Sequence, residues 1–342
     1  MQAIILAGGF GTRLRPLTYT RAKALLPILN KPMISYLVES LPSQVDKVVV
    51  AVNYRKDQIE KHFANHSFDK EIIVNDEPTP LGTAGAVKFA EKHITDSFFV
   101  INADIICSLK LDEMIDFHKK NNAVSTISLW PVDNVSEYGV VDIKSDGNVT
   151  GFVEKPKPQD APSDLINAGS YLLEYDVLDY IEKGRLVSME KEIFPQIIKD
   201  TKKFYGFTFK GYWVDVGRIS SYLDVHQLLL QKYNRSNNIG KNCTLNGVVT
   251  GTSIGNNVVI GNGSIITNSV IFDTACIGDD VKLDNCIIGQ NSTIHSFCNL
   301  SHCVVGDGEI VKEKSSFEKK IFWSQPVPQG YPKKQIGNVI GE

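Results

Sequence analysis

The chain has 342 residues, which is long for one compact core and predicts two domains. Hydrophobic residues make up 42% and charged residues 22%, as in folded globular proteins, so wholesale disorder is excluded. A net charge of −3 argues against a general nucleic-acid binder, and no apolar run is long enough to span a membrane, so we expect a cytoplasmic protein without nucleic-acid or membrane partners.

A glycine loop follows the first predicted strand. Residues 3–7 are apolar and are expected to form a buried strand, which stops at Gly8, Gly9 and Gly11, where a backbone without Cβ can turn and approach a ligand. The first 38 residues carry a charge of +5, all of it after Gly11. Backbone N–H groups and positive charge on one loop are how proteins hold polyphosphates, so the loop predicts a phosphate site. The alternative is a plain turn with solvated cations.

Two well-known nucleotide loops do not match this segment. The dinucleotide fingerprint needs a third glycine, where this chain has Leu14, and an acid at the end of the second strand, which residues 48–54 lack. The P-loop pattern of glycines followed by Lys and Ser or Thr is also absent. The loop belongs to neither class.

Strands and helices alternate from residue 33 to residue 130. Helices are predicted at 33–41, 55–64, 83–93 and 111–121, and strands at 47–53, 71–74, 98–102 and 123–130. This order predicts an α/β, Rossmann-like domain with a mostly parallel sheet covered on both faces. Ligands bind beyond the carboxyl ends of the strands in such sheets, where the glycine loop and Asp104 would fall.

The pattern changes after residue 138. Residues 139–153 hold two alternating strands around an Asp-Gly turn and predict a hairpin. Strands are expected at 168–174 and 204–209, and helices at 176–183 and 188–199. An amphipathic helix over 219–234 closes the first domain, 1–235, and His226 on that helix is expected to be a packing residue.

A repeat begins after residue 237. Ile254, Ile271, Ile288 and Val305 recur at every seventeenth position, and apolar residues recur at every sixth position within these blocks. Glycine and asparagine stand where tight corners need positive φ. The pattern predicts a hexapeptide-repeat β-helix of about four coils over 236–342, with a tail from residue 313 packed across the last coil, anchored at Phe322 and Trp323. A β-sandwich, the alternative, would not keep a constant period.

The six cysteines show no CxxC pair and no neighbouring histidine pair. We therefore expect small buried thiols rather than disulfides, and no structural metal.

Two segments at the start of the chain, GGFGTRLRPLT (8–18) and AKALLP (22–27), resemble the signature of sugar-1-phosphate nucleotidyltransferases, the nucleotide-sugar pyrophosphorylases. Further matching segments follow in the family's order: LGTAGA (81–86), FFVINAD (98–104), YGVV (138–141), FVEKP (152–156), INAG (166–169) and GYWVDVG (211–217). The repeats resemble the left-handed β-helix appended to many members. Among subfamilies the chain is most similar to the mannose-1-phosphate guanylyltransferases.

The resemblance implies an enzyme and a reaction. The phosphate of a sugar 1-phosphate, expected to be mannose 1-phosphate, attacks the α-phosphorus of a nucleoside triphosphate, expected to be GTP, and releases pyrophosphate. This nucleophile is already ionised, so no general base is required, and catalysis rests on positioning and charge stabilisation. The resemblance implies catalytic roles for Arg13, Lys23 and Asp104, with Mg²⁺ held by Asp104 and Asp215.

The resemblance also implies two sets of binding residues. The nucleotide set is Leu6, Ala7, Gly8, Gly9, Gly11, Thr12, Arg13, Lys23, Glu77, Gly82 and Asp104, and the sugar-phosphate set is Gly139, Glu154, Lys155 and Asn167. A carboxylate such as Glu77 only accepts hydrogen bonds, which favours guanine, with its two adjacent donors, over thymine or uracil. The chain departs from the family pattern at Thr79 and Pro80, which are inserted, and at Ala22 and Ala24, where prolines are usual.

Other functions stay open from the sequence. A thymidylyl- or uridylyltransferase acting on glucose 1-phosphate would share the motifs. The β-helix also occurs in acyltransferases, for which His295 and His302 are candidates. A non-catalytic regulatory subunit is the third alternative, but Arg13, Lys23, Asp104 and Asp215 are all retained. The β-helix is expected to mediate homo-oligomerisation.

Overall fold

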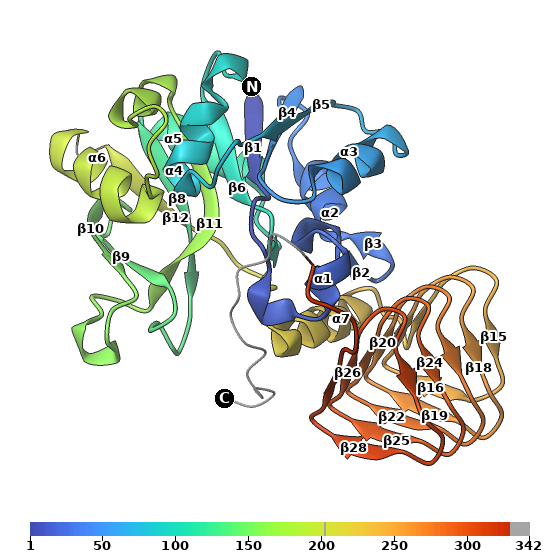
Figure 1. Cartoon of the computed structure of the whole chain (residues 1–342). Coiled ribbons are helices and arrows are strands. Elements are labelled where there is room, and N and C mark those ends of the chain that lie inside the picture. The colour runs from blue at the N-terminus through green and yellow to red at the C-terminus, as the bar shows by residue number, and fades with distance from the viewer. Residues whose placement is uncertain (202, 329–342) are drawn as a thin grey trace. The chain divides into compact units, whose positions relative to one another are not determined.

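The structure is a computed structural model that describes residues 1–201 and 203–328. Contacts group the chain into two compact units, each with its own core (Figure 1). The first unit joins Met1–Gly9 to Ile34–Val214, and the second joins Phe10–Met33 to Asp215–Glu342. The sequence-based division at residue 235 remains a proposal about domains.

The first unit is built on a nine-stranded sheet. Its strands are β1 (Gln2–Leu6), β4 (Lys47–Val52), β5 (Glu71–Asp76), β6 (Phe98–Asn102), β8 (Ser125–Pro131), β9 (Gly139–Ile143), β10 (Val149–Glu154), β11 (Leu165–Leu173) and β12 (Phe204–Thr208). Strands β5, β4, β1 and β6 pair in parallel, which confirms the predicted Rossmann-like core. Beyond β6 the sheet continues through antiparallel β11, and the predicted hairpin is confirmed as β9 and β10.

Helices connect these strands as the alternating pattern predicted. They are α2 (Met33–Ser40), α3 (Lys56–Ala64), α4 (Gly82–Phe89), α5 (Leu111–Lys120) and α6 (Phe194–Thr201), with shorter elements η3 (Glu91–His93), β7 (Ile105–Cys107), η4 (Pro158–Asp160), η5 (Tyr175–Tyr180), η6 (Met189–Ile193) and β13 (Trp213–Asp215). The predicted helix at 176–183 is wrong: η5 is a 3₁₀ helix of six residues. Over one or two turns, apolar residues three positions apart fit a 3₁₀ helix as well as an α-helix, so the spacing did not distinguish the two.

The second unit contains a three-sided parallel β-helix, seen as stacked coils in Figure 1. One side consists of β14 (Asn238–Ile239), β17 (Ser253–Ile254), β20 (Val270–Ile271), β23 (Ile287–Ile288), β26 (Val304–Val305) and β29 (Ile321–Phe322). The second consists of β15 (Thr244–Leu245), β18 (Val259–Ile260), β21 (Cys276–Ile277), β24 (Thr293–Ile294) and β27 (Ile310–Val311). The third consists of β16 (Val248–Thr250), β19 (Ile265–Thr267), β22 (Lys282–Asp284), β25 (Asn299–Ser301) and β28 (Ser316–Glu318).

The constant period of the repeat corresponds to the register of these coils. Ile254, Ile271, Ile288 and Val305 are successive register partners and are buried in the β-helix core. The described residues form five complete coils and begin a sixth, so the prediction of about four was too low. The first coil was missed because the step from Ile239 to its partner Ile254 is shorter than the step between later partners.

The predicted tail from residue 313 is also wrong in part. Residues 316–322 complete β28 and β29 of the β-helix instead of packing across it, and Phe322 packs against the coil core. The ring centres of Trp323 and Tyr19 lie 5.0 Å apart. The rest of the predicted tail, 329–342, lies outside the described residues.

Corner residues adopt the predicted left-handed conformation. Positive φ recurs once per coil at Asn257, Thr274 and Asn291, and again at Asp280 and Phe297. Asparagine tolerates this region better than β-branched or bulky residues, which explains its abundance in the repeats.

The segment Phe10–Met33 belongs to the second unit. It contains η1 (Thr12–Leu14), α1 (Leu17–Thr20), η2 (Lys23–Leu25), β2 (Pro27–Ile28) and β3 (Lys31–Pro32), and it contacts α7 (Ile219–Lys232). On α7, the Tyr222 hydroxyl donates to the carbonyl of Pro27, and the backbone N–H of Leu29 lies 3.5 Å from His226 Nδ1. His226 is 1% exposed, which confirms its packing role.

Two sequence expectations concern the whole chain. All six cysteines are free; Cys286, Cys298 and Cys303 are buried as expected, whereas Cys276 is exposed. In the part of the chain that the structure describes, no helix combines the length and apolar character needed to cross a bilayer.

Candidate active site

The end of β1 opens into the glycine loop. Ala7 N donates to Ala51 O at 2.9 Å, which aligns the ends of β1 and β4. A Cβ placed on Gly8 would lie 3.1 Å from Asn53 Nδ2, whereas one on Gly9 would meet nothing within 4 Å. Asn53 Oδ1 is buried and has no hydrogen-bond partner among the described residues, so this strand end combines open space with an available polar atom.

Glu77 is held inside the first unit beyond β5. Its side chain is 6% exposed, and Glu77 Oε2 accepts a long hydrogen bond from Leu81 N at 3.4 Å. Burial raises the pKa of this carboxyl. Gly82, the first residue of α4, has φ of 75°, and its missing Cβ allows close approach to the carbonyl of Val187. Asp104, half-buried, lies two residues after the end of β6.

The predicted sugar-phosphate residues gather on the hairpin and on β11. Gly139 and Glu154 are register partners, and a Cβ on Gly139 would lie 2.4 Å from Phe152 Cζ and 2.9 Å from Glu154 Oε2, so a larger residue here would displace both side chains. Lys155 Nζ lies 3.8 Å from Glu154 Oε1 and is largely exposed. Asn167 Nδ2 donates to the Tyr171 hydroxyl at 2.8 Å.

A polar network behind these residues was missed by the sequence reasoning. The Tyr171 hydroxyl donates to Glu190 Oε1 at 3.2 Å, and Glu190 Oε2 accepts from Thr83 Oγ1 at 2.8 Å and Ser188 Oγ at 2.7 Å. Burial and then the charge of Glu190 raise the pKa of Glu154. Glu190 therefore connects the sugar-phosphate set to the segment LGTAGA electrostatically and through hydrogen bonds. No signal in the sequence marks it, because its partners are distant along the chain.

In the second unit the glycine loop continues through Gly11. This residue has φ of 62°, and a Cβ there would lie 2.7 Å from Thr18 Cγ2 and 3.3 Å from Lys23 Cβ. Thr18 Oγ1 donates to Gly11 O at 2.8 Å, which fixes the turn. The loop is therefore folded back on the segment that carries Lys23, while Thr12 remains exposed.

Arg13 and Asp215 meet beside Gly217. A Cβ placed on Gly217 would lie 2.8 Å from Arg13 Nη2 and 3.0 Å from Asp215 Oδ1. The absence of a side chain at Gly217 thus makes room for both groups. Among residues 1–201 and 203–328, no three His, Cys, Asp or Glu side chains gather into a metal-binding group. A pair of aspartates suits Mg²⁺, which takes few carboxylates and completes its shell with water and phosphate oxygens.

The two histidines considered for acyl transfer lie on the surface of the β-helix. His295 and His302 are both exposed, and His302 Nδ1 lies 2.9 Å from Ser301 Oγ, its neighbour in sequence.

Together the parallel sheet, with its glycine-lined strand end, and the β-helix define an α/β protein with a repeat domain. Residues 2–232 match the model of the nucleotidyl transferase family. The chain belongs to this family. Residues 232–327 match a second model, described as the GMPPB C-terminal domain.

Curated relatives and a solved structure agree with this assignment. The chain is 43% identical over 241 residues to probable mannose-1-phosphate guanylyltransferase 2 of Arabidopsis thaliana, covering 67% of this chain and 65% of that protein. It is 41% identical over 244 residues to mannose-1-phosphate guanyltransferase of Yarrowia lipolytica, covering 69% and 66%. The chain thus spans just under two thirds of the length of these relatives.

The structural match covers a similar share of the chain. HddC from Yersinia pseudotuberculosis, complexed with GMP-PN, is 29% identical with a TM-score of 0.56, over 67% of this chain and 99% of that one.

Proposed function

We propose that this chain is a mannose-1-phosphate guanylyltransferase, which transfers GMP from GTP to mannose 1-phosphate and releases pyrophosphate. The observation that carries the proposal is the position of Arg13 and Asp215 around Gly217, since a cation for phosphate charge and a carboxylate for a metal meet where the backbone has no side chain. The names of the relatives from Arabidopsis and Yarrowia support the choice of substrates.

The nucleotide side of the site consists of backbone and cations. Leu6 ends β1, Ala7, Gly8 and Gly9 follow it, and Gly11 and Thr12 continue the loop, so N–H groups can line a triphosphate without side-chain obstruction. Arg13 would stabilise negative charge on the departing pyrophosphate, and Lys23 would pair with the phosphates. Gly82 would contribute its backbone to this side at the start of α4, where its missing Cβ leaves room for the carbonyl of Val187.

Glu77 would select the base. A buried carboxylate that only accepts hydrogen bonds is matched by the N1–H and N2–H₂ donors of guanine, and not by the single imide N–H of thymine or uracil. Because Glu77 is buried, an unmatched base would leave it with only the long hydrogen bond from Leu81 N.

The sugar phosphate would bind to the hairpin. Glu154 would accept hydrogen bonds from sugar hydroxyls, Lys155 would pair with the phosphate, and Asn167 and the backbone at Gly139 would complete this side. Because the attacking phosphate is already ionised, these residues need only orient it.

Asp104 and Asp215 would hold Mg²⁺ together with phosphate oxygens, and the ion would neutralise charge on the triphosphate. The half-buried carboxylates are donors of the type this ion prefers. Mg²⁺ would thus be the cofactor of the reaction.

The β-helix would mediate self-association. Outward-facing apolar side chains at Val248, 64% exposed, and Ile310, 63% exposed, offer contacts to a second copy of the chain. Light scattering at micromolar concentration tests the oligomer, and a monomeric mass would refute it.

The family matches at 2–232 and 232–327 support the division into domains 1–235 and 236–342.

A pyrophosphate-release assay with and without EDTA tests the reaction class. Wild type is expected to turn over GTP and mannose 1-phosphate only with Mg²⁺. Arg13→Ala should lower turnover about 100-fold or more. Arg185→Ala, which removes an exposed cation paired with Glu182 and Glu192, is the control and should retain wild-type turnover. Equal rates for the two variants would refute the role of Arg13.

A further inference from the structure

Asp307, in the corner after β26, makes two separate sets of hydrogen bonds. Its Oδ1 accepts from Gln290 N, 17 residues earlier, at 2.7 Å. Its Oδ2 accepts from Thr20 Oγ1 at 2.6 Å and from Arg21 Nη2 at 2.5 Å. Through Asp307 the β-helix is thereby hydrogen-bonded to the segment Phe10–Met33, which carries Arg13 and Lys23.

The first of these bonds is part of the coil itself. Asp273 Oδ1 accepts from Asn256 N, and Asp279 Oδ1 accepts from Asn262 N, each at 2.7 Å and each across 17 residues. An aspartate at these corners therefore joins one coil to the next. Asp307 also contacts Thr20 and Arg21, and this second role distinguishes it from Asp279.

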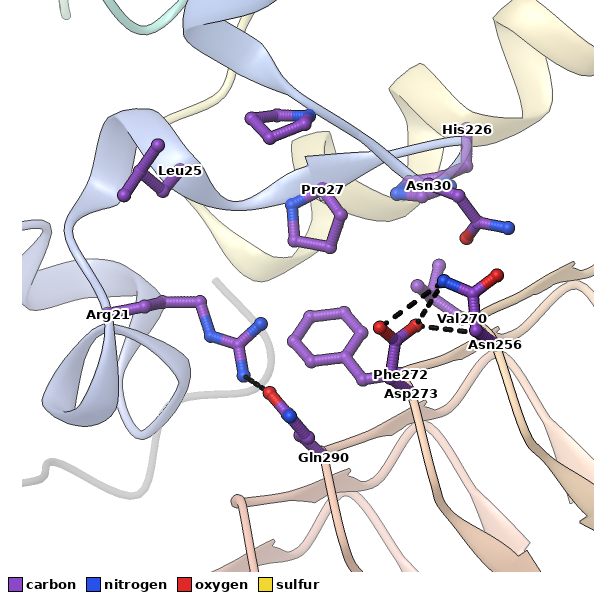
Figure 2. Close-up of a pocket in the computed structure, with 12 residues that line it drawn as sticks. Arg21, Leu25, Pro27, Asn30, His226, Asn256, Val270, Phe272, Asp273 and Gln290 are labelled. Carbon is purple, nitrogen blue, oxygen red and sulfur yellow. Dashed lines mark hydrogen bonds between the residues drawn. The ribbon is translucent and has the colours of Figure 1, made fainter. Parts of the chain in front are cut away.

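Arg21 is held on several sides. Its guanidinium carbon lies 4.5 Å from the centre of the Phe272 ring, and its Nη2 also donates to Gln290 Oε1 at 3.3 Å (Figure 2). The side chains of Arg21 and Asp307 are only 16% and 13% exposed. Screening by water is weak at such a site, so loss of one partner leaves the other charge poorly compensated.

A cavity of about 180 Å³ lies beside this ion pair, between the segment and the coils. Figure 2 shows Pro27 and Asn30 on one side of it and Phe272 and Asn256 on the other. Away from the cavity the middle of the segment is packed, since Leu26 and Ile28 are fully buried. On the side that faces the coils, polar contacts hold it, from Arg21 to Asp307 and from Asn30 Nδ2 to Ile254 O at 2.6 Å.

We propose that Asp307 is a positioning residue for the nucleotidyl transfer, acting through Arg21 and Thr20 on Lys23 and Arg13. Arg21 precedes Lys23 by two residues on the same short segment, so a shift of Arg21 moves the catalytic lysine. The β-helix is then part of the machinery that orders the phosphate-binding loop. This inference rests on the proposed function.

The test compares Asp307→Asn with Asp279→Asn in the full chain. Each variant keeps a side-chain oxygen that can accept the coil N–H, but only Asp307→Asn removes a charge from Arg21. Turnover of GTP and mannose 1-phosphate should fall about 10- to 100-fold in Asp307→Asn, because small displacements of catalytic groups have effects of this size. The KM for mannose 1-phosphate should stay unchanged, since its residues lie in the first unit. Asp279→Asn should behave as wild type.

Two further readouts separate positioning from a general loss of structure. Arg21→Gln should lower kcat less when it is added to Asp307→Asn than when it is made in the wild-type chain, since the contact between Arg21 and Asp307 is then already broken. Hydrogen exchange of peptides covering 10–33 should accelerate in Asp307→Asn and not in Asp279→Asn, at similar thermal midpoints.

Equal kcat and equal exchange in the two single variants would overturn the inference. Inactivity of the wild-type protein with every nucleotide and sugar phosphate would instead refute the proposed function. Hydrogen exchange, which needs no substrate, would then decide alone whether Asp307 orders the segment.

Discussion

Arg13 and Asp215 converge on the backbone of Gly217, each within 3.0 Å of the position a Cβ would occupy there. The two residues are far apart in sequence, yet the second unit brings the first charged residue of the glycine loop to the carboxylate that ends β13. A missing side chain thus serves the site directly, because any larger residue would displace one or both groups.

Gly217→Ala should therefore damage activity more than stability. The methyl group would meet the flexible end of Arg13, which can move at small energetic cost, but the move takes the guanidinium from its place. We expect kcat to fall about 10- to 100-fold. Thermal denaturation should change little. Gly151→Ala is the matched control, since a Cβ there meets only Asp142 Cβ at 3.6 Å, and its activity should be normal. Normal turnover in Gly217→Ala would contradict the arrangement.

Glu77→Gln should stabilise the ligand-free protein at neutral pH and weaken its preference for GTP. Burial raises the folded-state pKa of Glu77 above its ordinary value of 4.5. The unfolded chain therefore releases this proton at lower pH than the folded chain, and stability falls as the pH rises from the unfolded-state pKa to the folded-state pKa. Glutamine removes the penalty. We expect a thermal midpoint about 2 °C higher at pH 7.5, with no difference at pH below about 4.

The same variant tests the choice of base. Its amide can donate to a base carbonyl, so the ratio of kcat/KM for GTP to that for UTP should fall about tenfold or more. An unchanged ratio would exclude Glu77 from base recognition whatever the stability result.

The acid limb of the pH profile should report the pair Glu154 and Glu190. After burial, the charge of Glu190 is the main cause that raises the pKa of Glu154, and only ionised Glu154 accepts hydrogen bonds from the sugar on both oxygens. Glu190→Gln should move the acid limb of kcat/KM for mannose 1-phosphate to lower pH, by about half a unit.

Glu192→Gln, which changes an acid paired with Arg185, is the control for this shift. Ionisation of the substrate phosphate contributes equally in all three enzymes, so the difference between the profiles reports Glu154. Coincident profiles for both variants would show that Glu190 does not tune the site.

The sequence predicts those parts of the structure that repeat or alternate. The constant spacing from Ile254 to Val305 identifies the coils because each coil repeats the same burial pattern, and the first coil escapes only because its step to Ile254 is shorter. Alternating strands and helices likewise predict the parallel core. The 3₁₀ helix η5 was mistaken for an α-helix because a few periodic apolar positions carry no information about length.

The polar networks could not be predicted in the same way. Glu190 bonds to Thr83, 107 residues away, and Asp307 to Arg21, 286 residues away, and neither partner is marked by local spacing. Family resemblance supplied the residues that would touch substrates, such as Arg13 and Glu154. It did not supply the residues that hold them, because those depend on tertiary packing.

Phe297→Asn should stabilise the β-helix. Phe297 has φ of 60° and is 52% exposed, so it bears the strain of the left-handed region without the benefit of burial. Asparagine suits this conformation, and unfolding free energy should rise by about 1 kcal/mol. Ile310→Asn changes a similarly exposed residue in a strand and should give no increase. A lower midpoint for Phe297→Asn in thermal denaturation would refute the assignment of strain.

The central claim, guanylyl transfer to mannose 1-phosphate, is tested most directly by competition. The protein is incubated with Mg²⁺ and equal concentrations of GTP, dTTP, UTP, ATP and CTP, together with mannose 1-phosphate, glucose 1-phosphate and N-acetylglucosamine 1-phosphate, and the nucleotide sugars are identified by mass spectrometry after chromatographic separation. We predict GDP-mannose as the main product, formed in a 1:1 ratio with pyrophosphate. A dTDP- or UDP-glucose product would contradict the assignment of base and sugar, and absence of any nucleotide sugar would contradict the proposed reaction itself.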